Sequence, residues 1–336
     1  MPKLKFFDST LRDGSHANGH QFNEDQITSY CRQADKVGFY TIIVGHGNGL
    51  GASSLQVGLS KLTDNKMLSL ARENLNKTKL GVFLIPGWAT IKDNIKPAIE
   101  LGVDVAIVAA HCTEADLSKQ HIEYLAEKGV EVYGVLLMHH MATTKSLISE
   151  AQKMQNYGAN GIILMDSAGT TTLEMVEERI SSMVSTLDIS VGFHAHNNLG
   201  LAVANSYLSI KSGADIIDGT SGGFGAGAGN VPLEVIIGLL ERKGIPHHTD
   251  FYKAMDLSEQ FIDHYYPQGV QMNNNTLISG ISGVFSGYLN RVKNVANEFG
   301  VDSRDIFIEL GRMKIIAGQE DKIIEVARSL SKLEVS

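Results

Sequence analysis

Residues 130–166, VEVYGVLLMHHMATTKSLISEAQKMQNYGANGIILMD, carry the pattern that decides the fold. The stretch opens and closes with short, nearly continuous apolar runs, at residues 130–138 and 161–166. Between them, residues 146–158 have apolar side chains at helical spacing and end in a glycine. Two apolar strands separated by a helix predict a β-α-β unit whose parallel strands are buried on both faces.

The same alternation recurs along much of the chain. Helix-length segments such as DNIKPAIELG and LAVANSYLSIKSG separate further strand-like runs. About eight such units within roughly 240 residues predict an α/β fold of the closed (β/α)8 TIM-barrel type. An open, doubly wound sheet is the alternative. The six other strand-like runs lie at residues 3–9, 39–45, 79–85, 103–109, 189–196 and 214–220.

The pattern changes to helices alone near residue 267. The segments TLISGISGVFSGYLNRVKNVANEFG, SRDIFIELG and QEDKIIEVARSLSKL have helical spacing and no strand between them. This tail is too long to be one barrel cap. We therefore predict a catalytic barrel domain at residues 1–266 and an appended all-helical domain at residues 267–336.

Charge and cysteine content exclude several classes of protein. The formal net charge is -8 and no block of lysines or arginines stands out, which disfavours a nucleic-acid or anionic-membrane partner. The start, MPKLKFFDST, lacks the apolar run of a signal peptide, and no later stretch is long and apolar enough to span a bilayer. The only two cysteines, Cys31 and Cys112, argue against a disulfide framework and favour a cytoplasmic location.

Polar side chains gather at the carboxyl ends of the predicted strands, where TIM barrels carry their active sites. Arg12, Asp13 and His16 follow the first strand. His194 and His196 are two residues apart on the seventh strand, so their side chains leave the same face. Two imidazoles and the carboxylate of Asp13 could hold a divalent cation and leave its other positions open for substrate. A solvated loop edge is the alternative for the two histidines.

Two other clusters give weaker signals. The glycine-rich run at residues 222–230 lacks the spacing and the acidic partner of a dinucleotide fingerprint and follows the last strand, not the first. It is better explained as a loop that lets the backbone approach a carboxylate or phosphate. His111 and Cys112 are neighbours on an extended chain and point opposite ways, so we expect a structural role for them and not a nucleophile pair.

Several motifs together resemble one known family. They are TLRDGSHANGHQ, HCTEADLSKQHIEYL, MDSAG, HAHNNLGLAVANS, GAGAGNVPLEV and AGQEDKIIEVA. In this order they are similar to the 4-hydroxy-2-oxovalerate (4-hydroxy-2-oxopentanoate) aldolases. These are class II pyruvate aldolases of the metal-dependent lyase superfamily with an Arg-Asp-Gly motif, and they act in the catabolism of aromatic hydrocarbons. The resemblance covers nearly the whole chain and implies that the helical tail is a communication domain.

The resemblance also implies roles for individual residues. Asp13, His194 and His196 would bind the metal, usually Mn²⁺, with Co²⁺ or Mg²⁺ as other candidates. Arg12 would stabilise the enolate oxygen that forms as the carbon–carbon bond breaks. His16 would act as the base on the 4-hydroxyl group.

The substrate contacts include positions where this chain departs from the family. Ser167 is the expected contact for the substrate carboxylate. Ile43 stands where the family has a glutamate that orients the arginine, and Asn48 stands where an aspartate is common. Phe285 replaces an active-site tyrosine, and Asn18 lies in a changed dipeptide near the proposed base. We expect Asn18 and Phe285 to contact the substrate and to alter the choice of aldehyde.

The expected partners are a small 2-oxo acid substrate and, through the helical tail, an acylating acetaldehyde dehydrogenase. A homo-oligomer is also expected. Two alternatives to the aldolase remain. One is Claisen-type chemistry on an acyl-CoA, although residues 222–224 lack the cysteine found in the related lyases. The other is a weakly active subunit that serves as a scaffold for the dehydrogenase.

Overall fold

A computed structural model describes residues 4–265, 269 and 271–333 of the chain. Eight parallel strands, in sequence order, close into a barrel. Closure is direct, because β1 pairs with β8 and places Lys5 opposite Ile216. This excludes the open sheet and confirms the predicted TIM barrel. The strands are β1 (Lys5–Asp8), β2 (Thr41–Ile43), β3 (Lys79–Leu84), β4 (Val105–His111), β5 (Glu131–Leu137), β6 (Gly161–Asp166), β7 (Ser190–Ala195) and β8 (Ile216–Gly219).

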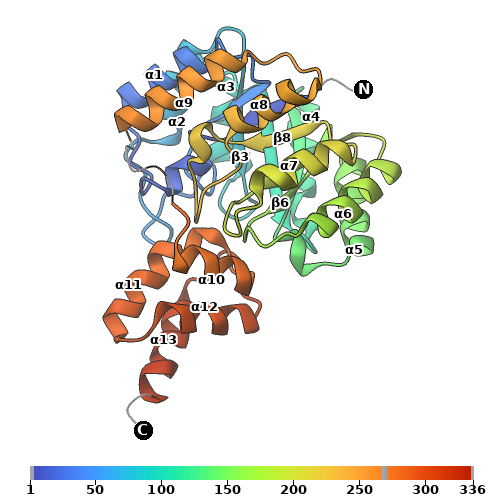
Figure 1. The fold of residues 1–336 in the computed structure, drawn as a ribbon. Helices are drawn as coiled ribbons and strands as arrows, with labels where there is room; N and C mark the ends of the chain where they lie inside the picture. The colour runs from blue at the N-terminus through green and yellow to red at the C-terminus, as the bar shows by residue number, and fades with distance from the viewer. Residues whose placement is uncertain (1–3, 266–268, 270, 334–336) are drawn as a thin grey trace.

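Helices surround the barrel, and Figure 1 shows the last of them, α9, lying beside α1. Each predicted strand overlaps the observed one, and a helical segment follows each strand. The bounds are α1 (Glu24–Ala34), α2 (Asp64–Asn74), α3 (Lys96–Glu100, preceded by a π-helical turn at Ile91–Ile95), α4 (Lys119–Glu127), α5 (Thr144–Asn156), α6 (Leu173–Thr186), α7 (Ala202–Lys211), α8 (Leu233–Lys243) and α9 (Phe251–Tyr265).

The barrel strands are apolar on both faces. On β4, the alternate residues Val105, Ile107 and Ala109 belong to one buried cluster, whereas Ala106 and Val108 belong to another. Because side chains alternate across a strand, the first cluster fills the barrel interior and the second packs against the surrounding helices. Burial on both sides explains why these strands read as continuous apolar runs.

Helices α10 to α13 form a second lobe, drawn in orange and red in Figure 1. The lobe has an apolar core of its own, centred on Val292, Phe307 and Ile323. The predicted domain division between residues 266 and 267 lies outside the described residues. The bounds are α10 (Asn274–Ser282), α11 (Leu289–Phe299), α12 (Ser303–Arg312) and α13 (Asp321–Leu333).

The lobe is joined to the mouth of the barrel at Ser286. The Ser286 backbone N–H donates to the Ser167 carbonyl at 2.9 Å, and the Ser286 hydroxyl accepts a hydrogen bond from Asn198 Nδ2 at 3.2 Å. These bonds seat Phe285 at the mouth of the barrel. Within the described residues, no helix has the length and apolarity needed to cross a membrane.

Candidate active site

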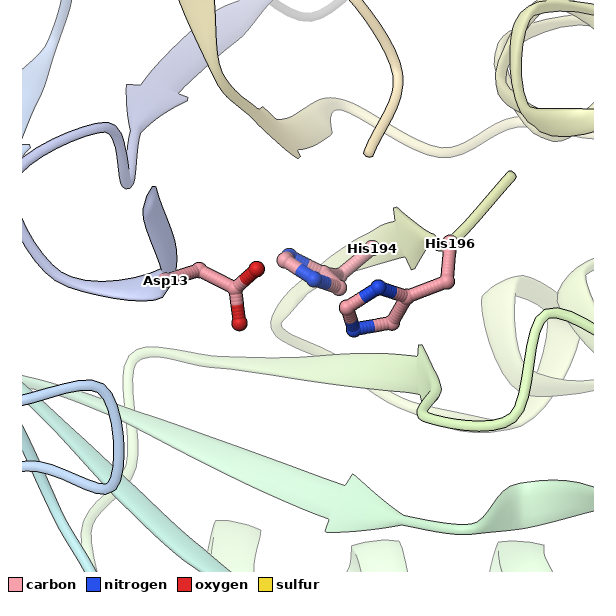
Figure 2. Close-up of side chains that lie close together, drawn as sticks. All are labelled: Asp13, His194 and His196. Atoms are coloured by element: carbon pink, nitrogen blue, oxygen red, sulfur yellow. The ribbon is translucent and has the colours of Figure 1, made fainter. Parts of the chain in front are cut away.

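Asp13, His194 and His196 converge inside the mouth of the barrel (Figure 2). Asp13 opens a 3-10 turn, Asp13–His16, just after β1. Phe193 and Ala195 of β7 belong to the outer apolar cluster, so the alternate residues His194 and His196 face inward. One ligand atom from each of the three side chains lies within 4.8 Å of the others, and all three side chains are buried.

The carboxylate of Asp13 is held by donors from three directions. Arg12 Nη1 donates to Oδ1 at 2.9 Å, while Asn230 Nδ2 and the Ala226 backbone N–H donate to Oδ2 at 2.6 and 3.2 Å. Gly225 allows this approach, because a Cβ there would lie 2.5 Å from Asp13 Oδ2. The glycine-rich loop therefore approaches a carboxylate, as predicted, but the carboxylate belongs to the protein.

The electrostatics keep Asp13 ionised. Burial alone would raise its pKa, but the net effect, in which the positive charge of Arg12 is the largest opposing influence, holds the pKa of this carboxyl well below its usual value. Burial lowers the pKa of His196 to about 4, despite the opposing effect of Asp13. An ionised Asp13 beside a neutral His196 is the protonation state that metal ligation requires.

The donor atoms present fit a divalent cation. Nε2 of His194 and Nδ1 of His196 have no hydrogen-bond partner among the described residues, although both atoms are buried. Asn230 Oδ1 is a further buried oxygen without such a partner. Buried polar atoms are rarely left unpaired in proteins. Two imidazoles and a carboxylate oxygen suit a first-row divalent metal ion.

Arg12 lies beside the triad with its side chain almost fully buried. Its guanidinium carbon sits 4.4 Å from the centre of the Phe83 ring, and Nη1 also donates to the Gly47 carbonyl at 3.3 Å. Ile43, by contrast, lies in the apolar cluster inside the barrel. The β2 strand therefore supplies no carboxylate to Arg12.

His16 lies at the mouth of the site, half-buried and packed against Gly47. A Cβ at Gly47 would lie only 2.5 Å from the imidazole, so the His16 ring can occupy this position only because residue 47 has no side chain. Burial lowers the pKa of His16, and Arg12 adds to that effect against the opposing pull of Asp13. A neutral imidazole at neutral pH has a nitrogen free to accept a proton.

A cavity of about 340 Å³ is lined by Arg12, Asp13, His16 and His196. Ser167 also lines the cavity, and its Oγ accepts a hydrogen bond of 3.1 Å from the Met138 backbone N–H. The hydroxyl itself donates a long hydrogen bond of 3.5 Å to the Met165 carbonyl, and a nearer carboxylate oxygen could replace that acceptor. The lining of the cavity also includes apolar side chains, those of Phe83, Ile85, Trp88, Phe285 and Ile316.

A second, larger cavity of about 770 Å³ lies between the barrel mouth and the helical lobe. His16, Asn48 and Phe285 line both cavities, so they form the shared wall. The Phe285 ring centre is 6.5 Å from that of His16. Tyr288 does not take the place of a tyrosine at position 285, because its hydroxyl donates to the Ile316 carbonyl at 2.6 Å.

Asn18 lies apart from the other predicted site residues. Its side chain accepts a hydrogen bond of 3.1 Å from the Gln21 backbone N–H. Its neighbours Ala17 and Gly19 line the larger cavity, whereas Asn18 lines neither of the two cavities as described. The predicted substrate contact of Asn18 stays a prediction that this geometry does not favour.

Cys112 does not form a nucleophile with His111. The two side chains do not point opposite ways, because Cys112 Sγ lies 3.9 Å from His111 Nε2. The thiol nevertheless donates to the Met138 carbonyl at 3.3 Å, and burial raises its pKa to about 12. A thiol in this state is a poor nucleophile. The expected structural role agrees with these contacts.

Sequence reasoning missed two residues that touch the triad, Asn230 and Asp218. Asn230 closes the glycine-rich run, and its place beside Asp13 depends on the path of that loop. Asp218 lies on β8 and follows Ile216, which faces the barrel interior. An acidic residue two positions after an inward apolar residue is the signal that could have found it.

Comparison with known proteins agrees with this architecture. Residues 3–261 match the HMGL-like family, and residues 270–332 match the DmpG-like communication domain. Among solved structures, the carboxyl transferase domain from Rhizobium etli pyruvate carboxylase is similar with a TM-score of 0.83 at 14% identity. That match covers 98% of this chain and 60% of the other, and it speaks for the fold alone.

Curated relatives are similar over nearly their whole length. The 4-hydroxy-2-oxovalerate aldolase of Spirochaeta aurantia is 47% identical over 329 residues, which are 98% of this chain and 96% of the relative. The 4-hydroxy-2-oxovalerate aldolase 2 of Salinispora arenicola is also 47% identical, over 98% of this chain and 94% of its own. The resemblance seen in the motifs is thereby confirmed, and the chain belongs to the 4-hydroxy-2-oxovalerate aldolase family.

Proposed function

We propose that the chain is a divalent-metal-dependent carbon–carbon lyase. It cleaves a 4-hydroxy-2-oxo acid, such as 4-hydroxy-2-oxopentanoate, to pyruvate and an aldehyde. The observation that carries the proposal is the convergence of Asp13, His194 and His196 at a cavity. Arg12, Asp13, His16 and His196 line that cavity. Relatives that bear the aldolase name along nearly the whole chain support it.

The triad would hold the cation, and we propose Mn²⁺ as the ion. Bound there, a divalent cation supplies Lewis-acid stabilisation of the negative charge that develops on the 2-oxo oxygen. The buried Arg12 guanidinium adds a fixed positive charge beside the same oxygen. Ser167 would donate a hydrogen bond to the substrate carboxylate and so fix its orientation.

Proton transfer falls to His16. Its free ring nitrogen accepts the proton of the 4-hydroxyl as the C3–C4 bond breaks. The electron pair of the O–H bond then forms the aldehyde carbonyl, and the pair of the C3–C4 bond becomes the enolate of pyruvate. Protonation of the enolate at C3 completes the products. The lowered pKa of His16 suits this role, because a base must be unprotonated at the working pH.

The helical lobe carries a further proposal. We propose that residues 267–336 form a domain that contacts an acylating acetaldehyde dehydrogenase, which the communication-domain match supports. A homo-oligomer and a cytoplasmic location stay predictions. The Claisen alternative has less support, because residues 222–224 offer no cysteine.

In the test, Mn²⁺ and 4-hydroxy-2-oxo acids of increasing chain length are added to metal-stripped protein, and the release of pyruvate is measured. Activity that disappears in Asp13→Ala and His16→Ala supports the aldolase. If no homologue yields pyruvate while the protein still binds the dehydrogenase, the aldolase proposal fails and the scaffold alternative is favoured. Cleavage of a carbon–carbon bond in an acyl-CoA, or its formation, in place of 2-oxo acid cleavage would favour the Claisen alternative.

A further inference from the structure

Asp218 is a buried aspartate that the proposed reaction does not use. Its Oδ1 accepts a hydrogen bond of 2.6 Å from Ser9 Oγ. Its Oδ2 lies 2.9 Å from His194 Nδ1 and 4.0 Å from Arg12 Nη2. The side chain is 1% exposed. The Asp218 carboxylate therefore contacts both His194, a candidate metal ligand, and the positively charged Arg12.

The contact with His194 has a consequence for the imidazole. Asp218 Oδ2 and His194 Nδ1 have no hydrogen-bond partner among the described residues, and they lie 2.9 Å apart without full hydrogen-bond alignment. A carboxylate at that distance favours the tautomer with the proton on Nδ1. Nε2 then keeps its lone pair and points away from Asp218. Metal-ligating histidines commonly have their second nitrogen held by a carboxylate in this way.

The contact with Arg12 concerns charge balance. Among the described residues, Asp13 and Asp218 are the carboxylates within 4.0 Å of the guanidinium. Ile43 brings no charge from β2. If Asp13 also neutralises a bound cation, Asp218 is the remaining negative charge for Arg12. A buried charge without a partner is strongly unfavourable, so Asp218 should hold Arg12 in place.

We propose that Asp218 is a positioning residue. It orients His194 so that Nε2 is the ligand atom, and it holds Arg12 in a chain that has no carboxylate at position 43. The inference rests on the proposed aldolase function and deepens it, because it says how this chain supports Arg12. It concerns placement only, since Asp218 does not reach the cavity lining described for the substrate.

The first test measures Mn²⁺ affinity by calorimetry on metal-stripped protein, without substrate. Asp218→Asn should weaken Mn²⁺ binding by about 10–100-fold, the usual cost of losing such a partner. At saturating Mn²⁺ the variant should also show a lower kcat, because Arg12 loses its second carboxylate. Equal Mn²⁺ affinity in Asp218→Asn and wild type would overturn the inference.

Asp8→Asn is the matched control. Asp8 is also a fully buried aspartate at a strand end, but its carboxylate accepts from Thr10 and Tyr30, away from the barrel interior. The control should retain wild-type Mn²⁺ affinity. Loss of affinity in both variants would mean that any buried aspartate matters, and it would also overturn the inference.

A second measurement needs no variant. ¹⁵N NMR of the metal-free wild type should show His194 with its proton on Nδ1, and a proton on Nε2 would contradict the inference. Pyruvate release by wild type is followed in parallel. If wild type makes no pyruvate but Asp218→Asn still loses Mn²⁺ affinity, the aldolase proposal fails and the positioning role stands. If wild type is active and the variant binds Mn²⁺ normally, the positioning role alone fails.

Discussion

Asn230 Nδ2 lies 2.6 Å from Asp13 Oδ2, so the end of the glycine-rich loop donates a hydrogen bond to the carboxylate at the centre of the site. The loop reaches this position because Gly225 has no side chain. A Cβ at Gly225 would lie 2.0 Å from Asn230 Nδ2. The contact between the loop and the Asp13 carboxylate therefore depends on the missing side chain at Gly225.

Substitution of Gly225 should disturb the metal site without unfolding the barrel. In Gly225→Ala the new methyl group must displace Asn230 or Asp13, and we expect Mn²⁺ affinity to fall by about 10–100-fold. Calorimetric titration measures this. Gly238→Ala is the control, because its Cβ would meet only the Phe251 ring, at 2.8 Å, on the outer helices. Equal affinity in both variants would contradict the prediction.

Phe285 should control which aldehyde the site accepts. The ring forms part of the apolar lining of the cavity, so Phe285→Ala should raise kcat/KM for substrates with longer 4-substituents, relative to the 4-methyl substrate, by about tenfold. Steady-state kinetics over a homologous series measure the ratio. Tyr288→Phe should leave the ratio unchanged, although loss of its bond to Ile316 should cost about 1 kcal/mol of stability. An unchanged ratio in Phe285→Ala would remove the residue from the specificity wall.

His16→Gln should lower kcat by about 10²–10⁴-fold, the usual contribution of a general base. Because burial lowers the pKa of His16, the acidic limb of the wild-type kcat/KM profile should have its midpoint below 6.5. Activity should rise with pH through that midpoint as the imidazole loses its proton. A His16→Gln variant that keeps both the rate and the acidic limb would assign the base elsewhere.

His46 should make the stability of the fold depend on pH. Its Nδ1 accepts a hydrogen bond of 3.0 Å from the Asn48 N–H, and its Nε2 donates to the Gly58 carbonyl at 3.1 Å. The folded state thus requires neutral His46, and burial lowers its pKa from 6.5 to about 4. Since the folded pKa is depressed, this stability is present above pH 6.5 and is lost as pH falls toward about 4. The gap corresponds to about 3 kcal/mol.

Urea unfolding at pH 7.5 and pH 4.5 measures this effect. The free energy of unfolding should fall less between the two pH values in His46→Gln than in wild type, because glutamine does not titrate. His20 and His140 also have depressed pKa values, so part of the slope should persist in the variant. An identical pH dependence in variant and wild type would rule out the contribution of His46.

Much of the fold could be predicted because its strands are buried on both faces. Such strands are continuous apolar runs, as residues 161–166 illustrate, and there the predicted and observed bounds coincide. Asp13 and His196 could be brought together in advance because barrel closure carries the ends of β1 and β7 into one mouth. Their predicted convergence depends on topology and not on exact side-chain packing.

The remaining features depend on contacts that sequence periodicity does not encode. Asp218 gains its importance from His194, which lies opposite it in the β7–β8 register. Met138 adopts the left-handed region, with φ at 53°, and this conformation aims its N–H at Ser167. Asn18 was expected near the substrate, but the local turn directs its side chain to the Gln21 backbone. The first outcome follows from the pairing of two strands, and the other two follow from the path of a loop.

The central claim is that Asp13, His194 and His196 hold a cation needed for cleavage of a 4-hydroxy-2-oxo acid. The most direct measurement is the initial rate of pyruvate release from 4-hydroxy-2-oxopentanoate while Mn²⁺ is titrated into metal-stripped protein. The rate should rise to a plateau in wild type and stay at background in Asp13→Ala at the same Mn²⁺ concentrations. An equal rate in stripped and Mn²⁺-loaded wild type, or full activity in Asp13→Ala, would contradict the claim.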